Sequence, residues 1–154
     1  MTGITITPAT VDDVETITAQ RRQMFVDMGY RDEGVLDAMC ERFAPWVRRR
    51  LEEGEYLAWF ARTPEGEVVA GAGLWLMDWP PHVVGPGTRR GNILNVYTRP
   101  ENRRQGIARA LVQAALEWCR AHHIVYVILH SSDEGRALYQ SLGFQPTNEM
   151  RLLL

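Results

Sequence analysis

The chain has 154 residues, of which 45% are apolar and 23% charged, and its formal net charge at pH 7 is −2. These values are typical of a globular chain that forms one domain, here residues 1–154, and they exclude a disordered or low-complexity protein. The nearly balanced charge provides no global positive field, so we expect neither nucleic acid nor a membrane surface as a partner. Any anion-binding site must be local.

The cysteines and the N-terminal residues bear on the compartment. Cys40 and Cys119 stand far apart, without a Cys-x-x-Cys spacing or a disulfide framework, which favours a reducing cytoplasm. Residues 1–8 contain no basic stretch followed by an apolar one, and no apolar run approaches the ~18 residues of a membrane span. We therefore expect a cytoplasmic protein. Cys119, His122 and His123 fall within one helical turn but have no fourth ligand, so we expect no metal.

The N-terminal third predicts one strand followed by two helices. Residues 3–7 alternate isoleucine and threonine with the period of a strand. Thr10 is a typical helix N-cap, and apolar residues then recur at helical spacing as far as Gly29. A second apolar stripe follows and ends near Leu51. Pro45 lies inside this second helix and should kink or split it.

The middle of the chain predicts a hairpin, a loop and a further strand. The β-rich runs 56–62 and 68–77 are joined by Thr-Pro-Glu-Gly, a turn sequence. Residues 78–91 contain several Pro and Gly breaks and predict a loop. Strand character resumes in residues 92–98.

The last third begins with the clearest helix of the chain, residues 104–121, which has opposite apolar and polar stripes. The uninterrupted apolar run 124–129 predicts a strand in the centre of a sheet. Residues 134–142 predict a short helix that stops at Gly143, and a last strand should follow it to the C-terminus. This order of elements predicts a mixed α+β sheet rather than a doubly wound one.

The most informative stretch runs from Val96 to Ala108, where a predicted strand turns sharply into the amphipathic helix. The first turn of a helix carries unpaired backbone N–H groups and partial positive charge, which suit a phosphate. Gly106 allows a ligand to approach the backbone, and Arg103 and Arg104 add positive charge. These residues alone also fit an ordinary Arg-rich turn. The chain has no lysine, which excludes a P-loop, and the dinucleotide Gly-x-Gly-x-x-Gly pattern is absent.

Two motifs in register carry a family resemblance. Arg103-x-x-Gly106-x-Ala108 matches the signature Arg/Gln-x-x-Gly-x-Gly/Ala, and Tyr139 lies in a segment, Leu-Tyr-x-x-x-Gly-Phe, that ends at Phe144. With these motifs the sequence resembles the GNAT acetyltransferase superfamily. The resemblance implies an α+β fold with a mixed, mostly antiparallel sheet flanked by helices, in which a splayed strand pair, 92–98 and 124–129, holds acyl-CoA.

The resemblance also implies which residues bind the cosubstrate, acetyl-CoA. Its pantetheine arm would bond to the backbone of the first splayed strand, as a peptide adds to a free sheet edge, and its pyrophosphate would lie on the N–H groups that open the helix. The implied cofactor-binding residues are Val96, Tyr97, Thr98, Arg103, Arg104, Gln105, Gly106, Ile107, Ala108 and Ser132. Relatives often carry Asn at the position of Ser132 and Gly at that of Arg104.

Direct acetyl transfer needs a neutral amine, a donor to the developing oxyanion and a proton for the departing thiolate. By resemblance, Tyr139 donates that proton and a backbone N–H near Val96 or Tyr97 polarises the carbonyl. A packing role for Tyr139 stays open. Asp78 and His82 are candidate general bases, and each also fits an ordinary polar loop residue. Four apolar residues fit either an acceptor pocket or the core: Trp75, Trp79, Met24 and Met28.

The resulting expectation is an acetyl-CoA-dependent N-acetyltransferase that acts on the primary amine of a small molecule. A protein or peptide N-acetyltransferase is one alternative, and a non-catalytic acyl-CoA sensor is another. A homodimer is compatible with the resemblance.

Overall fold

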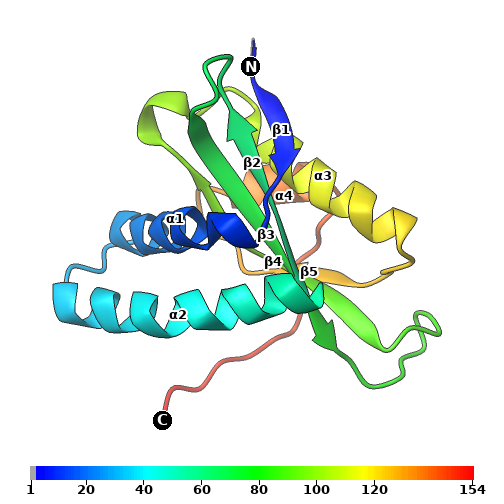
Figure 1. Ribbon diagram of the computed structural model, residues 1–154. Coiled ribbons are helices and arrows are strands. Elements are labelled where there is room, and N and C mark those ends of the chain that lie inside the picture. The colour runs from blue at the N-terminus through cyan, green and yellow to red at the C-terminus, as the bar shows by residue number, and fades with distance from the viewer. Residues whose placement is uncertain (1–2) are drawn as a thin grey trace.

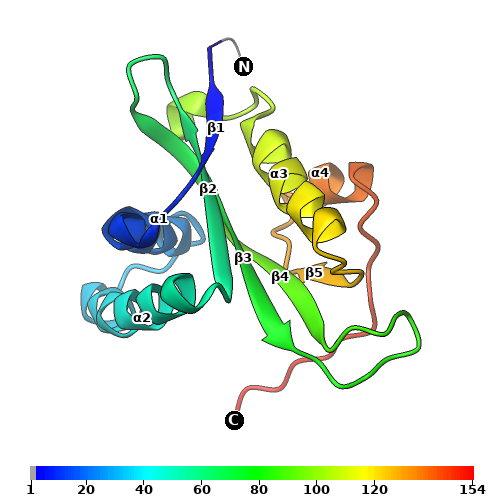
Figure 2. The same ribbon diagram turned by 45° about the vertical axis from the view of Figure 1, so that its right-hand side comes forward.

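The structure, a computed structural model, describes residues 3–154 as one five-stranded sheet with helices on both faces (Figure 1). Figure 2 shows α1 and α2 against one face of the sheet and α3 with α4 on the other. The mixed α+β architecture expected from the sequence is confirmed. The strands are β1 (Thr5–Pro8), β2 (Tyr56–Arg62), β3 (Val68–Asp78), β4 (Arg89–Thr98) and β5 (Val127–Leu129), and the helices are α1 (Val14–Asp27), α2 (Glu33–Glu53), α3 (Ile107–Ala121) and α4 (Arg136–Ser141).

The strands lie in the order β1-β2-β3-β4-β5, antiparallel from β1 to β4 and parallel between β4 and β5. Alternate side chains of β2, β3 and β4 point to opposite faces, so each face receives an apolar layer. Phe43 and Val47 of α2 fill the layer on the α1 and α2 side. Leu111 of α3 packs in the opposite layer against Ala70 and Ala72 of β3. The sheet therefore separates the apolar layer beneath α1 and α2 from the apolar layer beneath α3.

The start of α1 follows the sequence prediction. The Thr10 hydroxyl accepts from the Asp12 amide at 3.3 Å, and the Asp13 carboxylate accepts from the Thr10 amide at 2.7 Å. These bonds form a capping box around a short 3₁₀ turn, Val11–Asp13, that leads into α1.

The predicted split of the second helix is wrong, because α2 runs through Pro45 without interruption. Pro45 lies on the exposed side of the helix, whereas Phe43 and Val47 are buried. The carbonyl that loses its partner at a helical proline can bond to water on that side, so tertiary packing of the apolar stripe outweighs the local cost.

Two expectations for the last third of the chain are also wrong. β5 covers only Val127–Leu129 and is an edge strand rather than a central one. The final strand does not form, since residues 145–154 have no regular structure and lie beside β5 without a ladder. Pro146 has no N–H to donate to such a ladder, which removes one bond at its start. The exposed side chains of Met150 and Leu153 belong to this C-terminal segment.

The stop of the short helix α4 is as predicted. Gly143 has φ 97°, its amide donates to the Gln140 carbonyl at 3.0 Å, and the Phe144 amide donates to the Tyr139 carbonyl at 3.0 Å. This pair of bonds is a Schellman motif, and it fixes the position of Tyr139 relative to the chain that follows.

We predict that Gly73→Ala destabilises the protein by about 1–3 kcal/mol, the usual cost of overpacking. A Cβ at Gly73 would overlap the Tyr56 hydroxyl and lie 2.5 Å from its Cζ. Tyr56 cannot yield, because it is only 1% exposed. Urea denaturation measures the loss. Gly71→Ala is the comparison, since there the added carbon meets the flexible amide of Gln20; equal losses in the two variants would contradict the role given to Tyr56.

Candidate active site

The central feature of the site is the point at which β4 and β5 separate. Their pairing runs from Gly91 opposite Val127 to Ile93 opposite Leu129 and then stops, while β4 continues to Thr98. Its other edge remains paired with β3 as far as Ala70. Residues 94–98 therefore present one free backbone edge, and the splayed strand pair expected from the sequence is confirmed.

A bulge in β4 lies just after this separation. The register with β3 shifts between Gly71 and Gly73, so that Asn95 and Val96 together face the single residue Ala72. Asn95 has φ 55°, a left-handed conformation that asparagine tolerates better than most residues. A bulge leaves its extra residue outside the ladder and turns the strand locally. Unpaired backbone groups are therefore available beside the opening.

Three side chains hold the bulge in place. The Asn95 amide donates to the Tyr56 hydroxyl at 2.8 Å, and its carbonyl oxygen accepts from Arg21 Nη1 at 2.7 Å. The bond between Asn95 and Tyr56 is buried, and the bond from Arg21 is partly buried, so water competes little for either. Burial raises the pKa of Tyr56 to about 12, which keeps its hydroxyl neutral at physiological pH. The left-handed Asn95 is thus fixed by partners from α1 and β2.

The start of α3 forms the second part of the site. Arg104 and Gly106 have φ of 61° and 78°, and α3 begins directly after them at Ile107, three residues later than the sequence suggested. No side chain caps this helix, so the backbone N–H groups of its first turn have no side-chain acceptor. Alternating left-handed and right-handed residues before a helix form a concave nest of N–H groups that binds anions. A Cβ at Gly106 would meet nothing within 4 Å, which leaves room for a ligand.

The Arg103 side chain is engaged within the protein rather than directed into free space. Its Nε donates to the Thr98 carbonyl at 2.9 Å, and its Nη2 lies 2.6 Å from a carboxylate oxygen of Asp27. Arg103 therefore ties the loop before α3 to the end of α1. Gln105 donates to the Glu101 carbonyl at 3.5 Å. Within residues 3–154 the Arg104 side chain has no hydrogen-bond partner.

Tyr139 lies in α4, half-buried, with its ring edge against the Phe144 ring at a centroid distance of 6.0 Å. Its ring also packs on Gly135, where a Cβ would come within 2.9 Å of it. Burial raises the pKa of Tyr139 above its ordinary value, and its hydroxyl has no partner in the described part of the chain. Ser132 accepts from the Gly135 amide at 3.2 Å, so it shapes the same loop.

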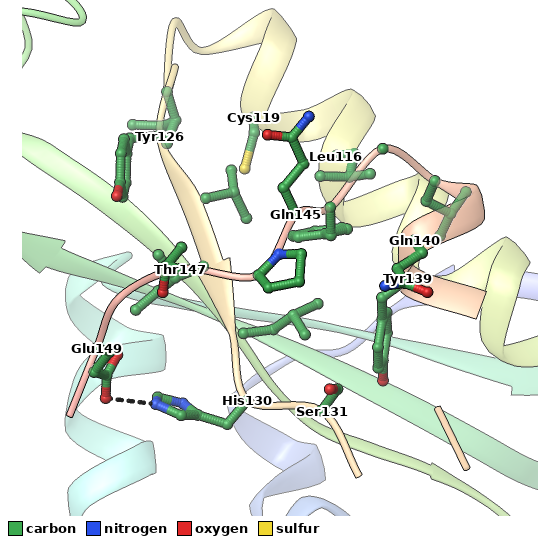
Figure 3. A pocket seen from close by; sticks show the side chains of 18 of the residues that line it. Leu116, Cys119, Tyr126, His130, Ser131, Tyr139, Gln140, Gln145, Thr147 and Glu149 are labelled. Carbon is green, nitrogen blue, oxygen red and sulfur yellow. Dashed lines mark hydrogen bonds and ion pairs between the residues drawn. The ribbon is translucent and has the colours of Figure 1, made fainter. Parts of the chain in front are cut away.

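A large hollow of about 1250 Å³ lies next to Tyr139 but is distinct from the strand opening. It is lined by the second half of α3, β5, α4 and the C-terminal segment, and no residue of β4 or of the α3 start contributes to it. Figure 3 shows Tyr139 at one end of this hollow and the ion pair between His130 and Glu149 at another. Tyr139 is the one predicted site residue that lines this hollow; the predicted residues of β4 and of the α3 start do not line it.

The two candidate bases lie away from the opening. Asp78 is exposed at the end of β3, opposite Arg89, and is six residues beyond the Ala72 position that faces the bulge. At ~3.4 Å per residue this is roughly 20 Å along the strand. His82 lies in the exposed loop after β3, where its ring is 6.4 Å from that of Trp79.

The sequence reasoning did not single out Asn95 or Tyr56. A signal existed for Asn95, because it interrupts an apolar strand with a residue that favours the left-handed region. No local pattern points to Tyr56, whose partner is 39 positions away. Of the four possible pocket residues, Trp75 does line a smaller hollow of about 300 Å³, whereas Met28 is 58% exposed on the far end of α1.

The free strand edge, the bulge and the uncapped helix start occur where the sequence resemblance predicts the acetyl-CoA site of an acetyltransferase. The Acetyltransferase (GNAT) family model matches residues 15–144, and the chain belongs to this family.

Known proteins resemble the chain over most of its length. The crystal structure of a GCN5-related N-acetyltransferase from Ralstonia eutropha JMP134 has a TM-score of 0.91 and 36% identity, with 99% of both chains covered. A predicted acetyltransferase from Clostridium acetobutylicum, described with acetyl-CoA, has a TM-score of 0.88 over 98% of this chain and 96% of its own; at 24% identity the likeness shows the fold alone. Human N-acetyltransferase 8 is 31% identical over 114 residues, 72% of this chain, and the chain spans about half (48%) of that relative.

Two features are absent from the described residues, 3–154. No helix there is long and apolar enough to cross a membrane. No three His, Cys, Asp or Glu side chains gather in the same part of the chain as a metal site would require.

We predict that Asn95→Gly lowers the free energy of unfolding by about 1–3 kcal/mol, because it leaves buried polar groups on Arg21 and Tyr56 without their partner. Asn95→Ala should lower the free energy of unfolding further, because the left-handed backbone is unfavourable for alanine but not for glycine. Denaturant titration of the three proteins separates the two contributions. Equal stability of the glycine variant and the unmodified protein would contradict the role of these hydrogen bonds.

Proposed function

We propose that the protein is an acetyl-CoA-dependent N-acetyltransferase that acts on the primary amine of a small molecule in the cytoplasm. The observation that carries the proposal is the position of the β4 bulge, which lies within the free strand edge of residues 94–98, upstream of the turn that leads into α3. Membership of the GNAT family supports acetyl transfer as the reaction.

In this proposal the cosubstrate lies along β4. The pantetheine amides bond to the free backbone at Val96, Tyr97 and Thr98, as an added strand does. The pyrophosphate lies on the nest from Arg103 to Ala108, where the helix dipole and the unpaired N–H groups favour negative charge. The Ser132 hydroxyl oxygen accepts from the Gly135 amide, which orients its O–H group for donation to the cosubstrate.

The chemistry then needs three contributions from the chain. A backbone N–H at the bulge, near Val96, polarises the thioester carbonyl and stabilises the oxyanion. The neutral amine forms the new C–N bond as the C–S bond breaks. Tyr139 protonates the thiolate, and its raised pKa keeps the required proton on the hydroxyl at neutral pH. Asp78 has no part in this proposal, because it lies too far along β3; the amine proton passes to water.

Two alternatives remain distinct from this proposal. A protein or peptide acceptor would need an extended groove, whereas the hollow beside the bulge is about 300 Å³, the lower end for small-molecule sites. A non-catalytic acyl-CoA sensor would bind the cosubstrate without turnover.

We predict that Gly106→Asp abolishes measurable CoA binding, because the new carboxylate lies where the pyrophosphate must approach. Isothermal titration calorimetry with CoA measures the effect. Gly54→Asp is the matched control: Gly54 also has a positive φ, 72°, and no neighbour within 4 Å, but it ends α2 at the other end of the sheet. Wild-type affinity in the Gly106 variant would refute the proposed pyrophosphate site.

We predict that Tyr139→Phe retains the fold and CoA affinity but slows turnover, since general acids contribute ~10²–10⁴-fold and a thiolate of pKa ~8.5 leaves fairly well unaided. The expected loss is therefore close to 100-fold. Release of CoA thiol at saturating acetyl-CoA measures it. An unchanged rate would exclude Tyr139 as the acid, and tight acyl-CoA binding without turnover of any amine by the wild type would favour the sensor.

We further propose that the chain forms a homodimer through its C-terminal segment and the free edge of β5. Leu152 and Leu153 are 80% and 84% exposed, and unpaired edges of this kind readily take up another chain. The double change Leu152→Asp with Leu153→Asp should convert the dimer to a monomer in sedimentation velocity. Val83→Asp, at a 97% exposed loop residue, should leave the dimer intact. A monomeric wild type would contradict this assembly.

A further inference from the structure

The hollow of about 300 Å³ next to the bulge is lined by both aromatic side chains and arginines. It lies between α1, α2, β3 and β4, and its lining is Arg21, Met39, Arg42, Phe43, Trp46, Trp75 and Leu94. Leu94 directly precedes Asn95, so the hollow and the proposed thioester position meet at the bulge. The lining contains two arginines and no carboxylate or histidine.

The apolar part of the hollow is aromatic. The Trp46 and Trp75 rings meet edge to face at 5.2 Å between centroids, and Phe43 stacks on Trp46 at 5.8 Å. Arg50 lies over the Trp46 ring at 4.0 Å. Such walls bind flat or branched apolar groups. They do not suit a cationic acceptor, because three guanidinium groups already surround them.

Arg21 lines this hollow, and one of its buried N–H groups lacks a hydrogen-bond acceptor. Its Nη1 bonds to Asn95, but its Nε is buried without any partner in the described chain. Its guanidinium lies 4.9 Å from the centroids of both Phe25 and Phe43, and it forms no ion pair within residues 3–154. A buried donor without a partner costs free energy unless a ligand satisfies it.

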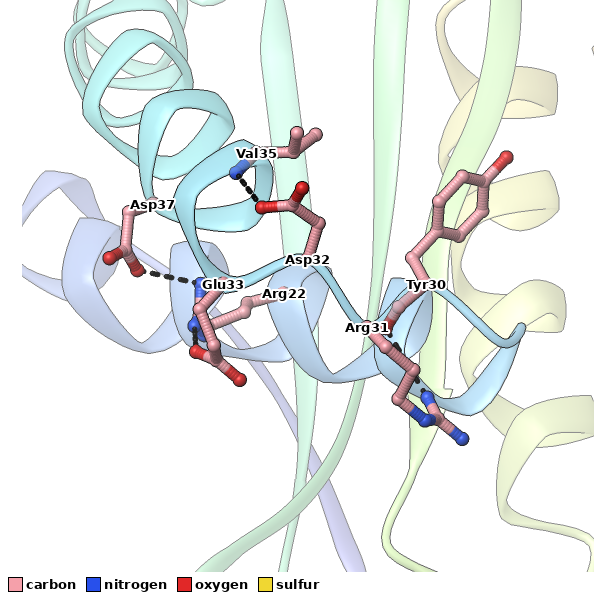
Figure 4. A network of polar contacts seen from close by, with 7 residues as sticks. All are labelled: Arg22, Tyr30, Arg31, Asp32, Glu33, Val35 and Asp37. Carbon is pink, nitrogen blue, oxygen red and sulfur yellow. Dashed lines mark hydrogen bonds and ion pairs between the residues drawn. The ribbon is translucent and has the colours of Figure 1, made fainter.

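The neighbouring Arg22, in contrast to Arg21, is paired with carboxylates. Figure 4 shows Arg22 between Glu33 and Asp37, and both ion pairs lie on the outer side of α1 and α2. Arg42, like Arg21, has no carboxylate partner and bonds only to the Ala38 carbonyl of its own helix, at 3.2 Å. Two unneutralised arginines therefore converge on the aromatic hollow.

We infer that this hollow binds the acceptor, and that the acceptor is an α-amino acid with an apolar, preferably aromatic, side chain. The inference rests on the proposed function and names its substrate class. Arg21 and Arg42 bind the carboxylate through charge-assisted hydrogen bonds, and the side chain lies against Trp46 and Trp75. The amino group, on the carbon next to the carboxylate, then reaches the bulge at Asn95.

The same charges help the reaction. Positive charge near an amine favours its neutral form, which is the nucleophile, so the hollow needs no carboxylate base. The amine lone pair forms the C–N bond to the acetyl carbon, the C–S bond breaks, the thiolate takes its proton from Tyr139, and water accepts the proton lost by nitrogen. The products are the N-acetyl amino acid and CoA.

The test compares L-phenylalanine with phenethylamine, which lacks only the carboxylate. In the wild type, kcat/KM for L-phenylalanine should exceed that for phenethylamine by about 10- to 100-fold, the range of charge-assisted hydrogen bonds. Arg42→Gln should reduce this preference at least several-fold, while Arg48→Gln, an exposed residue of the same helix without a partner in residues 3–154, should leave it unchanged. Equal use of both amines, or equal effects of both variants, would overturn the inference.

Calorimetry of the same two compounds with the CoA complex keeps this test separate from the proposed function. Carboxylate-dependent binding of L-phenylalanine without acetylation would support the hollow as an amino-acid site and refute the enzyme. Acetylation of amines with no preference for a carboxylate would support the enzyme and refute the amino-acid site.

Discussion

The hydrogen bonds from Arg21 and Tyr56 to Asn95 are the constraint on which the site depends. A left-handed residue in the middle of a strand is unfavourable by itself, and it persists only where the surroundings hold it. Here the partners come from α1 and β2, so the bulge depends on the packing of α1 against the sheet and on the place of β2 within it. The bulge in turn frees the backbone at the point where β4 leaves β5. The low polarity of the surroundings strengthens these hydrogen bonds. It also raises the free-energy cost of a substitution that leaves one partner unpaired.

Helix α1 connects the two halves of the site. Arg21 reaches the bulge, and Asp27, six residues further, holds Arg103 in the loop before α3. Six residues of α-helix span about 9 Å, so one rigid element sets the distance between the proposed acceptor side and the proposed cosubstrate side. The ion pair between Asp27 and Arg103 is partly exposed, with side-chain exposures of 31% and 42%. It therefore contributes little to stability, and its main effect is to position the loop before α3. The guanidinium of Arg103 orients the loop, while backbone N–H groups form the proposed anion site.

Charge is arranged in two ways in this lysine-free chain. Most ion pairs lie at the surface, where arginines such as Arg22 and Arg99 meet carboxylates. The arginines around the aromatic hollow have no such partners, and burial lowers the pKa of Arg21 without removing its charge at neutral pH. A fixed cation in a partly dry hollow acts more strongly on a ligand than one in water. Arg21 and Arg22, neighbours in one helix, therefore differ: Arg22 is neutralised by carboxylates, whereas Arg21 is not.

The sequence by itself determined the features that depend on local patterning. The helix cap at Thr10, the amphipathic α3 and the stop at Gly143 are set by residues a few positions apart. The motifs around Gly106 and Tyr139 carried the resemblance that predicted the family and, through it, the splayed strand pair. Only the tertiary structure decided what depends on distant partners. It kept α2 intact across Pro45 because its apolar stripe is buried, and it placed β5 at the sheet edge because no strand forms from residues 145–154. It also brought Arg21 and Tyr56 to Asn95 across 74 and 39 positions, a convergence that no local pattern encodes, because hydrogen-bond partners across layers are set by packing.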